Sequence, residues 1–174
     1  NDNLQGRFTY GKSNIKLNGT ALTFANGKPK DEITQGRIGT KLMPGTPMEK
    51  YLYDTYAYDS PLEKENLLDQ VQEVVVYGKI PRSSISIPTI TGQSYSPDFM
   101  YVVKKSDGSK TLNIVVETKD VENNSTLRQI EQIKINCAKE FFKQLTIDGY
   151  TVEFHEQINN KKIKQIVDEV LINN

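Results

Sequence analysis

Two stretches decide the fold of this chain: Ser96-Pro97-Asp98-Phe99-Met100-Tyr101-Val102-Val103 and Leu112-Asn113-Ile114-Val115-Val116-Glu117-Thr118-Lys119-Asp120. Both are rich in β-branched and aromatic residues, which favour strands. The polar segment between them contains Asp107-Gly108, and Asp-Gly is the strongest short signal for a hairpin turn. We therefore predict an antiparallel hairpin whose turn is centred on this dipeptide.

The hairpin would bring three charged residues together at its end away from the turn. Asp98 and Glu117 are equally distant from the turn dipeptide, so antiparallel pairing places them opposite each other. Opposed residues share a face of the sheet, and so do residues two apart on one strand. The sequence therefore predicts that Asp98, Glu117 and Lys119 converge.

Such a convergence predicts metal-dependent chemistry. Two close carboxylates repel each other, and partial burial increases the cost. A hard divalent cation relieves it, and Mg²⁺ typically binds through one or two carboxylates together with phosphate oxygens. A lysine beside them can hold a phosphate or stabilise a developing hydroxide. These groups are what metal-assisted hydrolysis of a phosphodiester requires.

The same residues resemble the PD-(D/E)XK nuclease signature, as Pro97-Asp98 followed by Glu117-Thr118-Lys119. From about Tyr58 to Leu145 the chain is similar to the C-terminal endonuclease domain of the Res subunit of type III restriction enzymes. The motifs that carry this resemblance are Tyr77-Gly78-Lys79-Ile80-Pro81, Ile87-Pro88-Thr89-Ile90-Thr91-Gly92, Tyr95-Ser96-Pro97-Asp98, Val116-Glu117-Thr118-Lys119 and Glu131-Gln132-Ile133-Lys134-Ile135-Asn136-Cys137-Ala138.

The resemblance implies a Mg²⁺-dependent endonuclease acting on double-stranded DNA, with Mn²⁺ as a substitute. It implies that Asp98, Glu117 and the backbone carbonyl of Thr118 bind the metal, and that Lys119 activates the attacking water. It also implies an ATP-dependent, helicase-like motor in the same polypeptide, outside this chain, and a methylase (Mod) subunit that supplies sequence specificity. Glu131 and Lys134 would be neighbours of the active site or of DNA.

Composition fits such a domain. The 174 residues carry a formal net charge of zero, which argues against tight independent DNA binding but not against delivery to DNA by a larger machine. The single Cys137 fits a reducing cytosol. The sequence has no apolar run of membrane-spanning length and no signal peptide, so we expect a bacterial cytoplasmic protein without membrane contact.

The first third of the chain predicts short strands and hairpins. We expect residues 1–57 to form a β-rich appendage or linker to a preceding motor domain, and residues 58–174 to form the endonuclease domain. Gly6 to Ser13 matches the phosphate-loop pattern, but the pattern needs a strand before it and a helix after it, and neither is indicated. Tyr51 to Tyr58 could be a helical turn or a strand.

A helix is predicted to begin after Ser60, where Ser60, Pro61 and Glu63 form a capping box with proline in the first turn. Leu67, Leu68, Val71 and Val74 would supply its apolar face. Glu63 has two open interpretations. It could be purely a cap, or it could be the acidic residue that the family places near the active site in Asp59-Ser60-Pro61-Leu62-Glu63, and one carboxylate could serve both purposes.

The next strand, Glu73 to Ile80, is apolar on both faces, which predicts a central position in the sheet. Lys79 and Arg82 at its end are interpreted as a solvated edge rather than as phosphate ligands.

A long helix follows the hairpin, with Asn123-Asn124-Ser125 as its cap and an end near Leu145. Its predicted buried stripe is Leu127, Ile130, Ile133, Cys137, Ala138, Phe141, Phe142 and Leu145. On its surface Glu131 and Lys134 are spaced to pair with each other. Tyr150 to His155 reads as a strand with His155 as an ordinary strand residue, and an amphipathic helix ends the chain. The order αβββαβ is the core expected of a restriction-endonuclease-like α/β fold with a mixed sheet.

Two alternatives stay open. The chain could be a non-catalytic docking domain that keeps the fold, although such a domain has no use for the electrostatic cost of Asp98, Glu117 and Lys119. It could also be a PD-(D/E)XK nuclease with another task in repair or defence.

Overall fold

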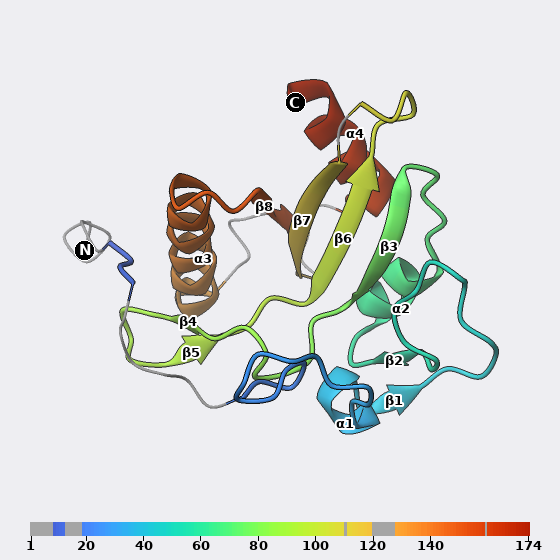
Figure 1. Ribbon diagram of the computed structural model, residues 1–174, viewed down its shortest axis with the longest axis horizontal. Helices are drawn as coiled ribbons and strands as arrows, with labels where there is room; N and C mark the ends of the chain where they lie inside the picture. Colours follow the sequence, from blue (N-terminus) through green and yellow to red (C-terminus); the bar gives the residue numbers. More distant parts are fainter. Residues whose placement is uncertain (1–8, 13–18, 110, 120–127, 159) are drawn as a thin grey trace.

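A four-stranded sheet forms the centre of the computed structural model, which describes residues 9–12, 19–109, 111–119, 128–158 and 160–174. The strand order is β3 (Val74–Lys79), β6 (Phe99–Lys104), β7 (Thr111–Thr118) and β8 (Val152–Gln157), as Figure 1 shows. The first three strands pair antiparallel, and β7 pairs with β8 in parallel. The parallel pair requires a crossover, which contains the long helix α3 (Gln129–Ile147).

Helices cover both faces of this sheet. On one face, α3 packs Cys137, Ala138 and Phe142 against Val115 of β7. On the other face, α2 (Pro61–Leu68) and α4 (Ile163–Asn173) pack against the second core cluster, which includes Phe99, Tyr101, Ile114 and Val116. The element order α2, β3, β6, β7, α3, β8 confirms the predicted αβββαβ core.

The β6–β7 hairpin has the predicted turn and register. Gly108 has φ of +75°, a conformation that glycine adopts without strain. Phe99 pairs with Val116 and Lys104 with Thr111, the register of a turn centred on Asp107 and Gly108. The last predicted residue, Asp120, lies outside the described residues.

The prediction of a central position for residues 73–80 was wrong, since β3 lies at the edge of the sheet and β6 and β7 are its central strands. The outer edge of β3 is nevertheless covered at Tyr77 by another segment of the chain. Tyr77 donates its N–H to Lys50 O (2.9 Å), and Leu52 donates to Tyr77 O (2.8 Å). The segment at Lys50 to Leu52 therefore covers the outer edge of β3. This cover explains why β3 is apolar, although Val75 remains 50% exposed.

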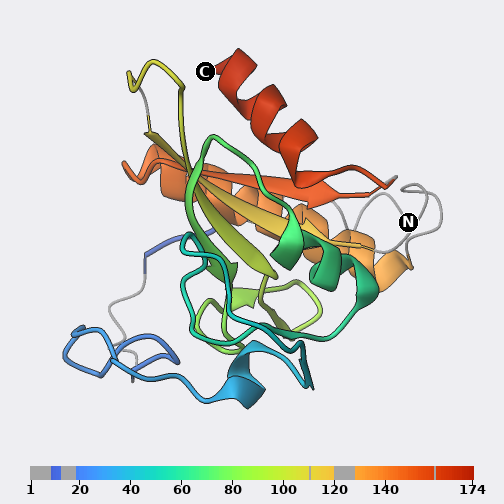
Figure 2. The same cartoon turned by 90° about the vertical axis from the view of Figure 1, so that its right-hand side faces the viewer.

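The short elements lie toward one end of the sheet (Figure 1 and Figure 2). A separate hairpin, β4 (Ile87–Pro88) with β5 (Ser94–Tyr95), packs on the α3 side. β1 (Lys41–Leu42) pairs with β2 (Ala57–Tyr58), so the predicted strand alternative applies to the end of the segment 51–58. The prediction of short strands and hairpins in the first third was partly wrong, because Gln35–Ile38 forms the short helix α1.

Both predicted apolar helix faces need correction. α2 ends at Leu68, so Val71 and Val74 belong to the turn and the strand that follow it. Leu68 itself is exposed. In α3, Ile130 is exposed, whereas the unpredicted Ile135 is fully buried. The described part of α3 has Arg128 at its N-cap, and the predicted cap 123–125 lies outside the described residues.

Two buried amides join β8 to α2. Asn66 Nδ2 donates to Gln157 Oε1 (2.6 Å), and Gln157 Nε2 donates to Asn66 Oδ1 (2.9 Å). Gln157 Nε2 also donates to Lys161 O (2.8 Å). This exchange holds the carboxyl end of β8 against the helix that carries Glu63.

The remaining predictions concern the chain outside the core. Of the phosphate-loop pattern, only residues 9–12 are described, so its test falls mostly outside the described residues. None of the described helices combines the length and the apolar character that crossing a membrane demands.

Candidate active site

Asp98 lies immediately before β6, at the end of the hairpin away from the turn. Its N–H donates to Val116 O (3.3 Å), so it continues the ladder beyond Phe99. Its Oδ2 accepts hydrogen bonds from the N–H (2.8 Å) and the hydroxyl (2.7 Å) of Thr118. Burial raises the pKa of Asp98, and the two Thr118 bonds oppose this only in part.

Glu117 lies near the end of β7 and is only 3% exposed. Its Oε1 accepts from Lys119 Nζ (2.7 Å), and its Oε2 accepts from the hydroxyl of Tyr95 (2.5 Å). Burial, followed by the charge of Asp98, raises the pKa of Glu117 to about 8. The ammonium of Lys119 offsets these two effects on the pKa of Glu117 only in part.

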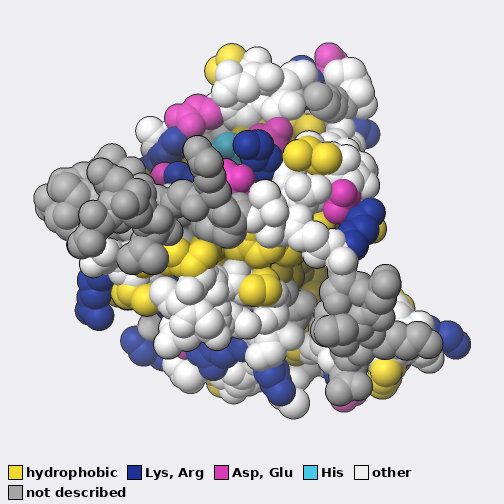
Figure 3. Space-filling model, turned by 90° about the vertical axis from the view of Figure 1, so that its left-hand side faces the viewer, with side chains coloured by type: hydrophobic (Ala, Val, Ile, Leu, Met, Phe, Trp, Pro, Cys, Tyr) yellow, Lys and Arg dark blue, Asp and Glu magenta, His cyan; other side chains and the backbone are white. Residues whose placement is uncertain are grey.

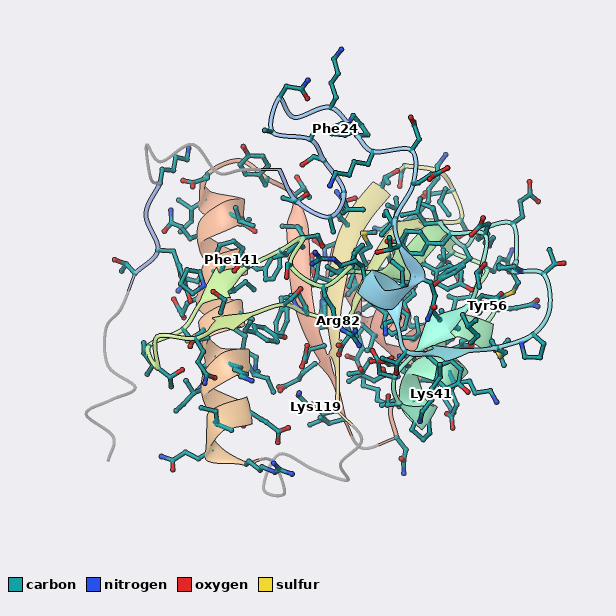
Figure 4. All side chains as sticks on the ribbon, turned by 90° about the horizontal axis from the view of Figure 1, so that it is seen from below. Phe24, Lys41, Tyr56, Arg82, Lys119 and Phe141 are labelled. Atoms are coloured by element: carbon teal, nitrogen blue, oxygen red, sulfur yellow. The ribbon has the colours of Figure 1, made fainter. Side chains whose placement is uncertain are left out.

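Lys119 joins the sheet to α3. Its Nζ lies 3.8 Å from Glu131 Oε1, in addition to its contact with Glu117. Burial favours the neutral amine, but the charges of Glu117 and Asp98 hold the pKa of Lys119 above its ordinary value. Figure 4 shows Lys119 at the end of the sheet, on the side toward α3. The structure thus brings together Asp98, Glu117, Lys119 and Glu131.

Glu131 does not pair with Lys134, contrary to the helix-surface prediction. Its carboxylate instead accepts from the N–H of Arg128 (3.2 Å) and faces Lys119. Lys134 is half-buried and forms no ion pair within the described part of the chain. Its ammonium is therefore not neutralised by a described carboxylate.

Glu63 takes part in the cap of α2 and also lies near Asp98. As a cap, its N–H donates to Ser60 Oγ (3.2 Å), while its carboxylate accepts from the N–H of Asp59 (2.6 Å) rather than from that of Ser60. At the same time its charge contributes to the raised pKa of Asp98. The side chain is buried, and Lys79 Nζ lies 2.7 Å from its Oε2.

The interpretation of Lys79 as a solvated edge was wrong. Lys79 is 3% exposed, and its Nζ contacts Glu63 and Asp59 (3.3 Å). Arg82 is half-exposed and pairs with Asp59 at 2.7 Å. The contacts of Asp59 with Thr40, Lys79 and Arg82 outweigh its partial burial and hold its pKa well below the usual range.

Sequence reasoning missed three of these participants: Asp59, Lys79 and Tyr95. One signal for Lys79 was available, since a lysine that ends an otherwise apolar strand needs an internal partner if that strand end is buried. The partner carboxylates come from another element, which strand periodicity does not identify. The contact of Tyr95 with Glu117 likewise joins two separate hairpins.

His155 lies in β8, as predicted, and contacts Glu153 at 3.2 Å. Close by, Lys139 of α3 pairs with Glu156 at 2.8 Å. Figure 3 shows acidic and basic side chains interspersed around the histidine. This part of the surface carries mixed charge, in keeping with the balanced composition.

Asp98 and Glu117 fit a hard divalent cation on the chemistry of their donors. Asp98 Oδ1 accepts no hydrogen bond from any residue that the structure describes. Each bonded oxygen of Glu117 retains a further acceptor direction. Among the described residues no group of three acidic, histidine or cysteine side chains could hold a metal, so the remaining ligands would be backbone, water or phosphate oxygens.

The raised pKa of Glu117 predicts a pH-dependent stability of the metal-free chain. Between the ordinary value of 4.5 and about 8, the folded chain binds more protons at Glu117 than the unfolded chain. This contribution to stability is present below 4.5 and is lost as the pH rises through about 8. We expect the urea midpoint in EDTA to fall between about pH 5 and about pH 8, and to fall less in Glu117→Gln. If the urea midpoint falls equally in both chains, the pH dependence does not come from Glu117.

The αβββαβ core, with two acidic residues and a lysine at one end of its mixed sheet, places the chain in the restriction-endonuclease-like class. A family model described as an endonuclease domain matches residues 49–161. The chain belongs to this endonuclease-domain family.

Its relatives are Res subunits of type III restriction-modification enzymes. The chain is 38% identical to the EcoPI Res subunit of Escherichia phage P1 and 37% identical to the EcoP15I Res subunit of Escherichia coli. Each match covers 98% of this chain and 18% of the relative, so the chain spans about a fifth of the length of these proteins. No solved structure matches the chain.

Proposed function

We propose that this chain is a Mg²⁺-dependent endonuclease that hydrolyses phosphodiester bonds of double-stranded DNA, as part of a type III restriction enzyme. The observation that carries the proposal is the pair of half-buried Asp98 and buried Glu117, with Lys119 at 2.7 Å from Glu117. Raised pKa values in both carboxyls mark a site that needs more positive charge than the chain supplies. The family match supports the same reaction.

In this proposal Asp98 and Glu117 hold the cation, together with the backbone carbonyl of Thr118. The bound Mg²⁺, or Mn²⁺ in its place, would supply Lewis acidity and a lowered pKa of coordinated water. Thr118 orients Asp98 through its N–H and hydroxyl, which leaves Asp98 Oδ1 available. Glu63 adds a further carboxylate near Asp98.

Lys119 has the central role in charge stabilisation. Its ammonium lies at the open end of the sheet, one-fifth exposed, between Glu117 and Glu131. From there it would orient the attacking water and stabilise negative charge that develops on the phosphate while the 3′ oxygen leaves. Lys134, whose ammonium is without a described counter-ion, would contact the DNA backbone.

The relatives' names as type III Res subunits support a proposal about the wider setting. We propose that residues 58–174 are the nuclease proper and that residues 1–57 connect it to an ATP-dependent, helicase-like motor. A methylase (Mod) subunit would supply sequence specificity, in the bacterial cytoplasm. The isolated chain should then cut unrelated DNAs equally well, and strict site preference would contradict this division of roles.

The direct test is a calorimetric titration of Mn²⁺ into the chain, beside Asp98→Asn and Glu117→Gln. Saturable binding that weakens at least about tenfold in both variants is expected, since each loses a charged oxygen ligand. A parallel titration with a short duplex present allows phosphate oxygens to complete the site. Identical isotherms for all three chains under both conditions would reject the metal site and favour a docking domain.

A further inference from the structure

Tyr95 is outside the nuclease signature, yet it contacts Glu117, the proposed metal-binding carboxylate, directly. Its hydroxyl donates to Glu117 Oε2 at 2.5 Å. The contact crosses between separate elements, because Tyr95 belongs to β5 and Glu117 to β7. β5 pairs only with β4 among the described strands, so backbone hydrogen bonds do not account for this proximity.

The ring of Tyr95 is fixed by the core. Tyr95 is 7% exposed and packs in the cluster that contains Ile87 of β4 and Cys137 of α3. Its backbone is held by the pairing of β5 with Ile87. A buried aromatic ring has few accessible rotamers, so the hydroxyl is delivered to one position.

The two oxygens of Glu117 therefore have different partners on different elements. Oε2 is bonded to Tyr95, and Oε1 is bonded to Lys119. Two such bonds define the plane of the carboxylate and the directions of its remaining lone pairs. Hydrogen bonds to ligating carboxylates are known to fix their orientation and to support metal affinity.

We propose that Tyr95 is a positioning residue, whose hydroxyl holds Glu117 in the orientation that binds the divalent cation. This inference rests on the proposed metal site. It extends the site from the β6–β7 hairpin to the β4–β5 hairpin, which then serves to place one hydroxyl. Deleting that hydroxyl would weaken cation binding without removing any ligand.

The test is Tyr95→Phe, which keeps the ring and removes the hydroxyl. Tyr101→Phe is the matched control, because Tyr101 is a 4% exposed tyrosine of β6, the strand next to β7, and its hydroxyl is buried without a partner among the described residues. We expect the Mn²⁺ dissociation constant from calorimetry to rise about tenfold in Tyr95→Phe and to stay unchanged in Tyr101→Phe. Thermal melting of both variants checks that the fold is kept.

A second measurement separates positioning from a structural effect. In DNA cleavage by Tyr95→Phe, the Mn²⁺ concentration for half-maximal rate should rise about tenfold, while the rate at saturating Mn²⁺ returns to within about twofold of the unmutated chain. Suppose that folded Tyr95→Phe keeps its Mn²⁺ affinity while Glu117→Gln loses it. This result would overturn the role of Tyr95 and leave the metal site standing. Equal affinity in the unmutated chain and Glu117→Gln would overturn the metal site and this role together.

Discussion

Replacing Lys119 by methionine is expected to slow DNA cleavage by about 100- to 1000-fold, the usual cost of removing one group that stabilises charge in a transition state. Methionine retains much of the aliphatic length of lysine but has no charge. The change also removes the cation that lies 2.7 Å from Glu117, so the pKa of that carboxyl rises further.

The matched control is Lys139→Met. Lys139 pairs with Glu156 at 2.8 Å, and Glu156 lies beside Glu117 in the β7–β8 register. The two ion pairs thus have similar distances and carboxylates on neighbouring strands, but only one contains the proposed catalytic lysine. Single-turnover cleavage of a plasmid should fall in Lys119→Met and stay within about twofold in Lys139→Met. Equal losses in both would show that general electrostatics, and not Lys119, controls the rate.

Replacing Lys79 by methionine is expected to destabilise the chain by about 3–5 kcal/mol, because it leaves a buried carboxylate without its counter-ion. Glu63 is 6% exposed and accepts from Lys79 at 2.7 Å. The loss would be a large part of the total stability of a typical domain, which is about 5–15 kcal/mol. A lower urea midpoint with an unchanged m-value would report it.

Two further variants make this second prediction specific. Lys162→Met removes a lysine whose partner Glu65 lies 3.0 Å away, with both side chains mostly exposed, and should leave the midpoint nearly unchanged. The double change Lys79→Met with Glu63→Gln removes both charges and should recover part of the lost stability. If the single and double variants are equally unstable, the ion pair is not the source of the loss.

The β6–β7 hairpin was predictable from sequence because its determinants are local. Asp107-Gly108 specifies the turn, and the alternation on both sides specifies the register that places Asp98 near Glu117. The same locality applies to the start of α2, where Ser60 caps the helix as expected. The convergence of Glu117 with Lys119 followed from strand periodicity alone.

Features that depend on distant segments were not predictable in this way. β3 appeared central because the segment at Tyr51 and Leu52 covers its outer edge, a contact between parts of the chain that are separated by a helix. The burial of Lys79 depends on carboxylates that α2 and its preceding turn bring from elsewhere. Periodicity describes which side of one element is apolar, but not which element covers it.

The amide exchange between Asn66 and Gln157 has a consequence for the accuracy of folding. β8 is an edge strand, and a shift of one residue along β7 would turn Gln157 toward the opposite face. Asn66 would then be buried without a partner, and the carbonyl of Lys161 would lose its donor as well. The same shift would break the stacking of Phe154 on Phe142, so the amide pair and this packed ring together favour the alignment in which Glu117 and Glu156 are neighbours.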